Sequence, residues 1–222
     1  DYIQRSNALL ISIFSTFDRL YLSSKLESIE QIILKQISIA LKNHPEILNC
    51  IFSLIIETMN KEREEFVGNF RLCFPPEELL VPSKIIEKLN LSELFIPILA
   101  SKTKDFYSRI DFSKKNPCDF SNEIYSIIKS EQVLVSYFGT EVEKAHIASC
   151  RACLYIEKFH KEMTSILQWL LNNQEYRALQ IFINLVYESA DEVLINSFVK
   201  SFSVVLQERC EEILSISATS NN

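Results

Sequence analysis

The stretch from Leu94 to His160 decides the fold: LFIPILASKTKDFYSRIDFSKKNPCDFSNEIYSIIKSEQVLVSYFGTEVEKAHIASCRACLYIEKFH. Its apolar residues recur at steps of three and four residues, which is the periodicity of amphipathic helices. The pattern predicts the end of one helix, a second helix that ends at Gly139, and a third that begins at Thr140. The stripe of the first of these helices comprises Phe95, Leu99, Thr103, Phe106 and Tyr107.

The rest of the chain has the same character. Two glycines and six prolines among 222 residues leave few of the tight turns that β-hairpins need. We therefore predict an all-α fold of antiparallel helical bundles.

Two capping boxes predict where helices begin. Ser28 with Gln31 and Thr140 with Glu143 have the Ser/Thr-x-x-Glu/Gln spacing in which side chains satisfy the free amides of a first turn. From Thr140 an apolar pattern continues to about residue 171, so we expect one long helix there. The helix that starts at Ser92 is expected to reach about residue 113.

The composition argues against several classes of function. A formal charge of −6, with acidic and basic residues interspersed, disfavours a nucleic-acid-binding surface. No apolar run reaches the ~18–20 residues of a membrane span. Six cysteines lie scattered in a chain that is long enough to bury a core without disulfides. Reduced thiols are expected, and with them a location in the cytoplasm and nucleus.

Only one pattern suggests metal or redox chemistry. His146, Cys150 and Cys153 give H-x3-C-x2-C within a helix, but a structural zinc site needs a fourth ligand, and no second cysteine pair follows. Packing is the better interpretation of these cysteines. We find no nucleophile elbow, phosphate-binding loop or facing carboxylate pair. We therefore predict that the chain has no catalytic residue, cofactor or metal and is not an enzyme.

The order of several segments resembles the cullins, the scaffold subunits of RING-type ubiquitin ligases. The segments are Thr103–Arg109, Glu123–Tyr125 and Glu157–Glu162, in register over some sixty residues. Residues 129–135 depart from the family pattern because they are more apolar than expected. The resemblance implies cullin repeats stacked into an elongated, solenoid-like stalk. It places the last helix of the first repeat at residues 1–24, the second repeat at 25–158, and the start of the third with a polar tail at 159–222.

The same resemblance implies a function and partners. It implies a rigid scaffold segment of a cullin-RING E3 ubiquitin ligase, linking a substrate-receptor adaptor at the N-terminal end to a catalytic module. The RING subunit would bind a C-terminal domain outside these residues. Residues off the main apolar stripe of the first helix are candidates for contact with the adaptor, or else pack against helices that precede them. They are Tyr2, Arg5, Ser6 and Leu9. An alternative function is a rod-like helical subunit of a vesicle-tethering complex.

Overall fold

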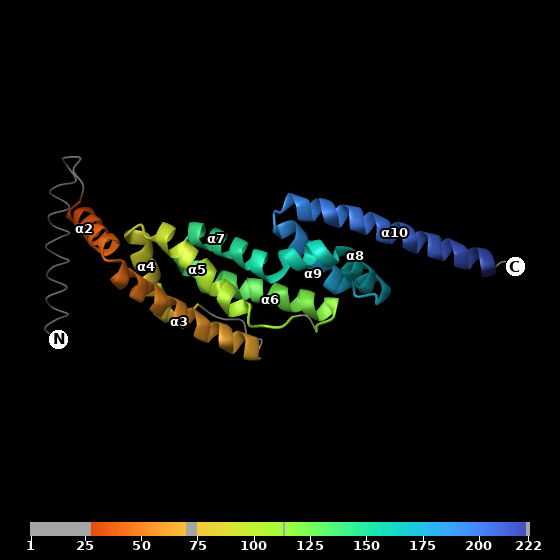
Figure 1. The fold of residues 1–222 in the computed structure, drawn as a ribbon, viewed down its shortest axis with the longest axis horizontal. Helices are drawn as coiled ribbons and strands as arrows, with labels where there is room; N and C mark the ends of the chain where they lie inside the picture. The colour runs from red at the N-terminus through yellow and green to blue at the C-terminus, as the bar shows by residue number, and fades with distance from the viewer. Residues whose placement is uncertain (1–27, 70–74, 113, 221–222) are drawn as a thin grey trace.

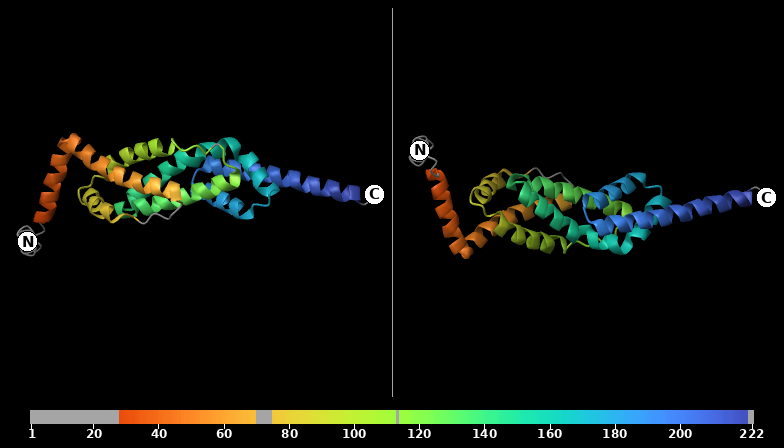
Figure 2. Two further views of the ribbon diagram at one scale, coloured as in Figure 1. Left: turned by 90° about the horizontal axis from the view of Figure 1, so that it is seen from below. Right: turned by 90° about the horizontal axis from the view of Figure 1, so that it is seen from above.

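The chain folds into an elongated stack of helices, with α2 (Ile29–Asn43) at one end and α10 (Glu192–Ser220) at the other (Figure 1). The structure is a computed structural model that describes residues 28–69, 75–112 and 114–220, and no strand occurs in these ranges. In both further views α10 projects beyond the other helices (Figure 2). The predicted all-α class is confirmed.

The elements between these two ends are α-helices with short 3-10 and π segments. They are α3 (Pro45–Asn69), η2 (Glu77–Leu79), α4 (Leu80–Lys88), α5 (Ser92–Tyr107), α6 (Pro117–Val135), η3 (Ser136–Phe138), α7 (Thr140–Arg151), the π turn η4 (Ala152–Ile156), α8 (Glu157–Asn172) and α9 (Tyr176–Glu188).

The first predicted capping box is present and the second is not. The Ser28 hydroxyl accepts from the Gln31 amide at 3.1 Å, and the Gln31 side chain accepts from the Ser28 amide at 3.0 Å. Thr140 is instead the first helical residue of α7, and Gly139 precedes it at a φ of 82° without a side-chain cap. The expected end of α5 near residue 113 was also wrong, because α5 ends at Tyr107. The long helix from Thr140 is confirmed to Asn172, with an unpredicted π turn inside it.

The turns between helices show how a chain with two glycines reverses direction. Asn90, Gln174 and Ala190 have φ values of 51°, 57° and 56°, and each lies just after a helix. Helices commonly end on such a left-handed residue, usually glycine. At the first turn, the Leu91 amide donates to the Ile86 carbonyl at 2.9 Å and closes the helix end. Here residues other than glycine take this role.

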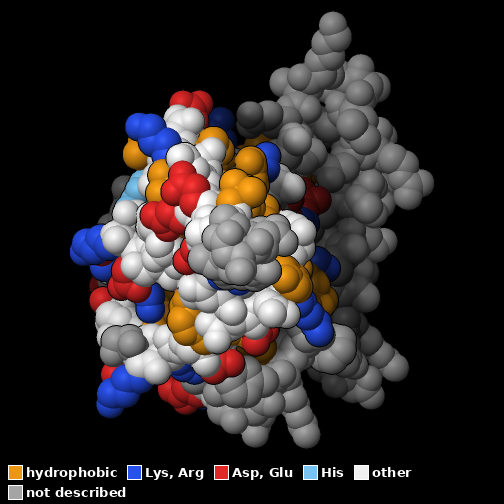
Figure 3. Space-filling view, turned by 90° about the vertical axis from the view of Figure 1, so that its right-hand side faces the viewer, with side chains coloured by type: hydrophobic (Ala, Val, Ile, Leu, Met, Phe, Trp, Pro, Cys, Tyr) orange, Lys and Arg blue, Asp and Glu red, His pale blue; other side chains and the backbone are white. Residues whose placement is uncertain are grey.

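A continuous apolar core runs along the stack. α3 packs against α5, α5 against α7, and α6 against both α7 and α9, while α8 packs against α9 and α10. α6 therefore contacts helices on both sides of the π turn. The end face around α10 shows acidic and basic side chains interspersed with apolar ones (Figure 3). Among the described residues, no helix is both long enough and apolar enough to cross a bilayer.

Candidate functional site

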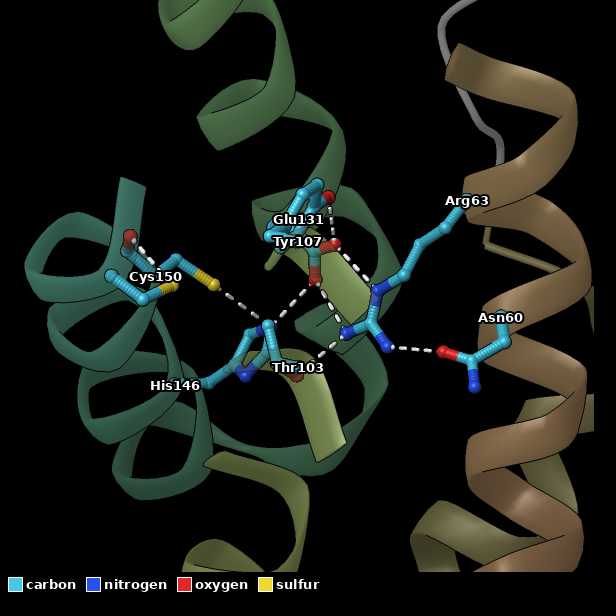
Figure 4. A network of polar contacts seen from close by, with 8 residues as sticks. Asn60, Arg63, Thr103, Tyr107, Glu131, His146 and Cys150 are labelled. Carbon is cyan, nitrogen blue, oxygen red and sulfur yellow. Dashed lines mark hydrogen bonds and ion pairs between the residues drawn. The ribbon is translucent and has the colours of Figure 1, made fainter. Parts of the chain in front are cut away.

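Side chains from four helices meet in a buried ionic cluster (Figure 4). α3 provides one of them, α5 two, and α6 and α7 one each. The cluster comprises Arg63, Thr103, Tyr107, Glu131 and His146, each at most 4% exposed. Its directly bonded pair Arg63 and Glu131 lies 68 positions apart in the sequence.

The centre of the cluster is a bidentate ion pair. Arg63 Nε donates to Glu131 Oε1 at 2.6 Å, and Arg63 Nη2 donates to Glu131 Oε2 at 2.9 Å. The guanidinium also donates to Thr103 Oγ1 at 2.9 Å and to Asn60 Oδ1 at 2.8 Å. The fork geometry of arginine suits a carboxylate in this way, and a buried charge is tolerated only when it is paired and hydrogen-bonded.

Two further groups complete the shell of Glu131. The Tyr107 hydroxyl donates to Oε1 at 2.5 Å, and His146 Nε2 lies 2.6 Å from Oε2. Because Nε2 faces a carboxylate, we assign the ring proton to it. Burial alone would raise the pKa of Glu131, but Arg63 and the hydrogen bond from His146 hold it well below its usual range. Burial and the charge of Glu131 raise the pKa of Tyr107. The cluster is thus one carboxylate surrounded by donors.

The ionic cluster includes part of the sequence pattern that suggests a metal site. Glu131, His146 and Cys150 place ligand atoms within 4.8 Å of one another. However, both carboxylate oxygens already pair with Arg63, so a dication would lie beside a guanidinium. Burial raises the pKa of the Cys150 thiol well above its usual value, which disfavours the thiolate that a metal requires. Cys153 instead donates to the Cys150 carbonyl, at 3.3 Å. The donor set fits an ion pair and not a metal.

The ionic cluster predicts a specific dependence of stability on pH. Because folding lowers the pKa of Glu131, this carboxylate stabilises the fold above its unfolded pKa of about 4.3. The contribution is lost as pH falls below that value. We expect the free energy of unfolding to decrease between about pH 5 and pH 3, with Glu131 contributing up to about 1.4 kcal/mol per pH unit. Denaturant titrations at a series of pH values measure this slope.

Glu131→Gln is the matched variant for this measurement. It should have a shallower slope than the parent over the same pH range, because the titrating group is gone. Equal slopes in the two proteins would show that Glu131 does not control the acid limb.

The sequence contains a signal for the cluster that helical periodicity alone does not reveal. Arg63 follows Met59 by four residues on the buried stripe of α3, and Glu131 lies among buried Ile127, Ile128 and Leu134 on α6. A charge at a position where an apolar residue is expected is informative, because charged residues are almost never fully buried unless paired. A pair of such misplaced charges of opposite sign predicts a buried ion pair.

A row of aromatic rings crosses from the helices around the cluster to α8–α10. Successive ring centroids along the row lie 4.5–6.2 Å apart. The row comprises Phe112, Phe120, Phe159, Phe182, Phe198 and Phe202. Tyr155 joins at Phe159, with centroids 4.8 Å apart, and its hydroxyl donates to the Leu185 carbonyl of α9 at 3.0 Å. We call this aromatic row, together with Tyr155, the joint.

The joint has an open side next to the π turn. A pocket of about 440 Å³ lies there, between the segment that leads into α6 and the start of α8. Lys158 lies over the Phe120 ring, with its ammonium 4.1 Å from the ring centroid. Lysines and glutamates both line the pocket, so neither charge dominates it.

The predicted partner-binding residues Tyr2, Arg5, Ser6 and Leu9 lie outside the described residues. The described chain nearest to them in sequence is α2, which exposes a set of isoleucines. They are Ile32, Ile33, Ile37 and Ile39, each 38–46% exposed. Together with α4, this helix forms an apolar groove that includes Leu34, Leu41 and Ile85.

Comparison with known proteins identifies the family. The family model described as the Cullin alpha solenoid domain matches residues 2–222. Comparisons with curated proteins and with solved structures returned no match. The match covers nearly the whole chain and agrees with the stacked helices and with the resemblance found in the sequence. The chain therefore belongs to the cullin family.

Proposed function

We propose that this chain is a rigid, non-catalytic scaffold segment of a cullin-RING E3 ubiquitin ligase. It would form part of the stalk that links a substrate-receptor adaptor to the catalytic C-terminal module. The observation that carries the proposal is the elongated stack of a cullin solenoid domain, in which one helix runs from Thr140 to Asn172 past the joint. Family membership favours this role over the vesicle-tethering alternative.

The stalk would act through geometry. Each group of helices packs on its neighbours, and a stiff stack fixes the distance between bound substrate and the ubiquitin donor. We place the last helix of the first repeat at residues 1–24, the second repeat at 25–158, and the start of the third at 159–222. The aromatic row supports a stiff connection at the boundary between the second and third repeats, because Phe159 contacts both Phe120 and Phe182.

Both partners would be proteins. The adaptor would bind toward the N-terminal end, with Tyr2, Arg5, Ser6 and Leu9 as contact residues. The exposed isoleucines of α2 support packing against further helices or a partner at this end, because adjoining exposed apolar residues are typical of interaction surfaces. The RING subunit would bind through the C-terminal domain, and the assembly would act in the cytoplasm and nucleus.

A flexible insertion tests the proposal in a ligase reconstituted from the complete polypeptide, its adaptor and a RING subunit. A glycine–serine segment inserted after Ala152 interrupts the helix that passes the joint. We expect substrate ubiquitylation to fall on the order of tenfold or more, because the reacting groups lose their fixed separation. Adaptor binding, measured by calorimetry, should be unchanged.

Two control variants separate the possible outcomes. The same segment inserted after Asn172 lengthens the turn between the packed helices α8 and α9, so activity should be retained. The double variant Tyr2→Ala and Arg5→Ala should weaken adaptor binding, and unchanged binding would mean that these residues pack internally. Full activity of the Ala152 insert would refute the rigid spacer. Failure of the complete chain to bind both an adaptor and a RING subunit would refute the ligase role.

A further inference from the structure

The helix from Thr140 to Asn172 contains an irregularity that its sequence composition does not explain. This segment has neither proline nor glycine, the usual causes of a break. Residues 151, 152, 156 and 157 all keep right-handed helical dihedral angles. Within this otherwise regular helix, Ala152–Ile156 form a π turn. A π turn closes hydrogen bonds between residues five apart instead of four, so it contains one more residue than an α turn.

The buried residues show the same one-residue offset. Two series of side chains follow four-residue steps, and every member is at most 6% exposed. The first series is Val142, His146, Cys150 and Leu154. The second series is Tyr155, Phe159, Met163 and Leu167. The first series ends and the second begins at adjacent residues inside the π turn.

The two series have different neighbours. In the first, His146 bonds Glu131 of α6, and Cys150 Sγ lies 3.4 Å from His146 Nε2. In the second, Tyr155 bonds the Leu185 carbonyl of α9, and Phe159 contacts Phe182 of α9, with ring centroids 4.5 Å apart. The first series therefore packs at the ionic cluster, and the second series packs at the joint.

We propose that the π turn is a one-residue register adjustment that lets a single helix contribute buried side chains to both the ionic cluster and the joint. It absorbs the extra residue locally, so that α7 keeps its orientation toward the cluster while α8 keeps its orientation toward α9 and α10. Without it, an extra residue in a regular α-helix would rotate everything beyond it by about 100°. Met163 and Leu167 would then turn away from the core.

Deletion of Ala152 tests this assignment. The residue is exposed, and its removal places Tyr155 four residues after Cys150. With Tyr155 four residues after Cys150, a regular α-helix gives the second series the same orientation relative to the first series that the π turn gives it in the parent. We expect the ΔAla152 protein to unfold cooperatively with a denaturant midpoint close to that of the parent. Amide hydrogen exchange in α9 and α10 should stay as slow as in the parent.

The matched control is deletion of Lys161, an exposed residue of the regular helix α8. This deletion breaks the spacing between Phe159 and Met163 where no π turn can absorb it. We expect a much lower denaturant midpoint, or no cooperative transition, and fast exchange in α9 and α10. Deletion of Lys144 in α7 should also lower the denaturant midpoint, because it breaks the spacing between Val142 and His146.

The outcomes are distinct. If ΔAla152 lowers the midpoint and the exchange protection as much as ΔLys161 does, the π turn is not a register adjustment. The importance of the turn for a ligase stalk rests on the proposed function. The two measurements use only this chain, so they can fail or succeed independently of adaptor binding and ubiquitylation.

Discussion

Replacing Glu131 with glutamine is expected to lower the free energy of unfolding by ~3–5 kcal/mol, the usual result of breaking a buried ion pair. The reason is that Arg63, which is 1% exposed, keeps its positive charge but loses its counterion. Arg63→Met should also be strongly destabilising, because it leaves the Glu131 carboxylate without the guanidinium. Equilibrium denaturation monitored by circular dichroism measures both changes.

A double variant distinguishes coupling from mere loss of packing. Arg63→Met combined with Glu131→Leu removes both charges and fills similar volume, so we expect it to cost much less than the sum of the single variants. Additive losses would show that the pair is not energetically coupled. Glu157→Gln is the surface control: its partner Lys161 is 2.6 Å away, but both side chains are at least 70% exposed, and we expect no measurable change.

Truncating Phe159 to alanine is expected to destabilise the joint by ~3–5 kcal/mol, the range for a buried aromatic residue. Phe159 is 0% exposed and contacts Phe120, Tyr155 and Phe182, so its removal leaves a cavity at the centre of the aromatic row. We expect α8–α10 to unfold before the rest. Trp169, the only tryptophan, lies in α8 and reports on this part by fluorescence. Its transition should precede the loss of circular dichroism.

The control for this prediction is an aromatic residue of the same region that is not buried. Tyr187 of α9 contacts Phe198 but is 53% exposed, so Tyr187→Ala should leave the two transitions coincident. If the two probes also coincide in Phe159→Ala, then α8–α10 do not unfold separately, and the joint is not the weaker boundary.

Helical periodicity was enough to predict the fold, but it could not predict local departures from periodicity. The long helix from Thr140 followed from its apolar pattern, yet the π turn within it shifts that pattern by only one residue. The Thr140 capping box failed because Gly139, with its positive φ, takes the cap position and offers no side chain. A four-residue motif does not specify which backbone conformation precedes it.

The ionic cluster was not predicted, because its parts are far apart in the sequence. Arg63 belongs to a charged run, 61–65, which resembles an ordinary solvated helix end. Only the packing of α3 against α5, of α5 against α7 and of α7 against α6 brings it to Glu131 and His146. Cys150 is buried in the core and Cys153 packs partly buried against it, which is the placement expected for packing residues.

The ionic cluster also bears on the order in which the stalk comes apart. In most solenoids each unit contacts only its neighbours, so folding and unfolding can proceed from any end. Here, separating α3 from α6 would leave a charge in an apolar core, which makes partial opening of this part costly. Helices α3, α5, α6 and α7 should therefore behave as one cooperative unit. Reversible local unfolding is then concentrated in α2 and in the projecting half of α10.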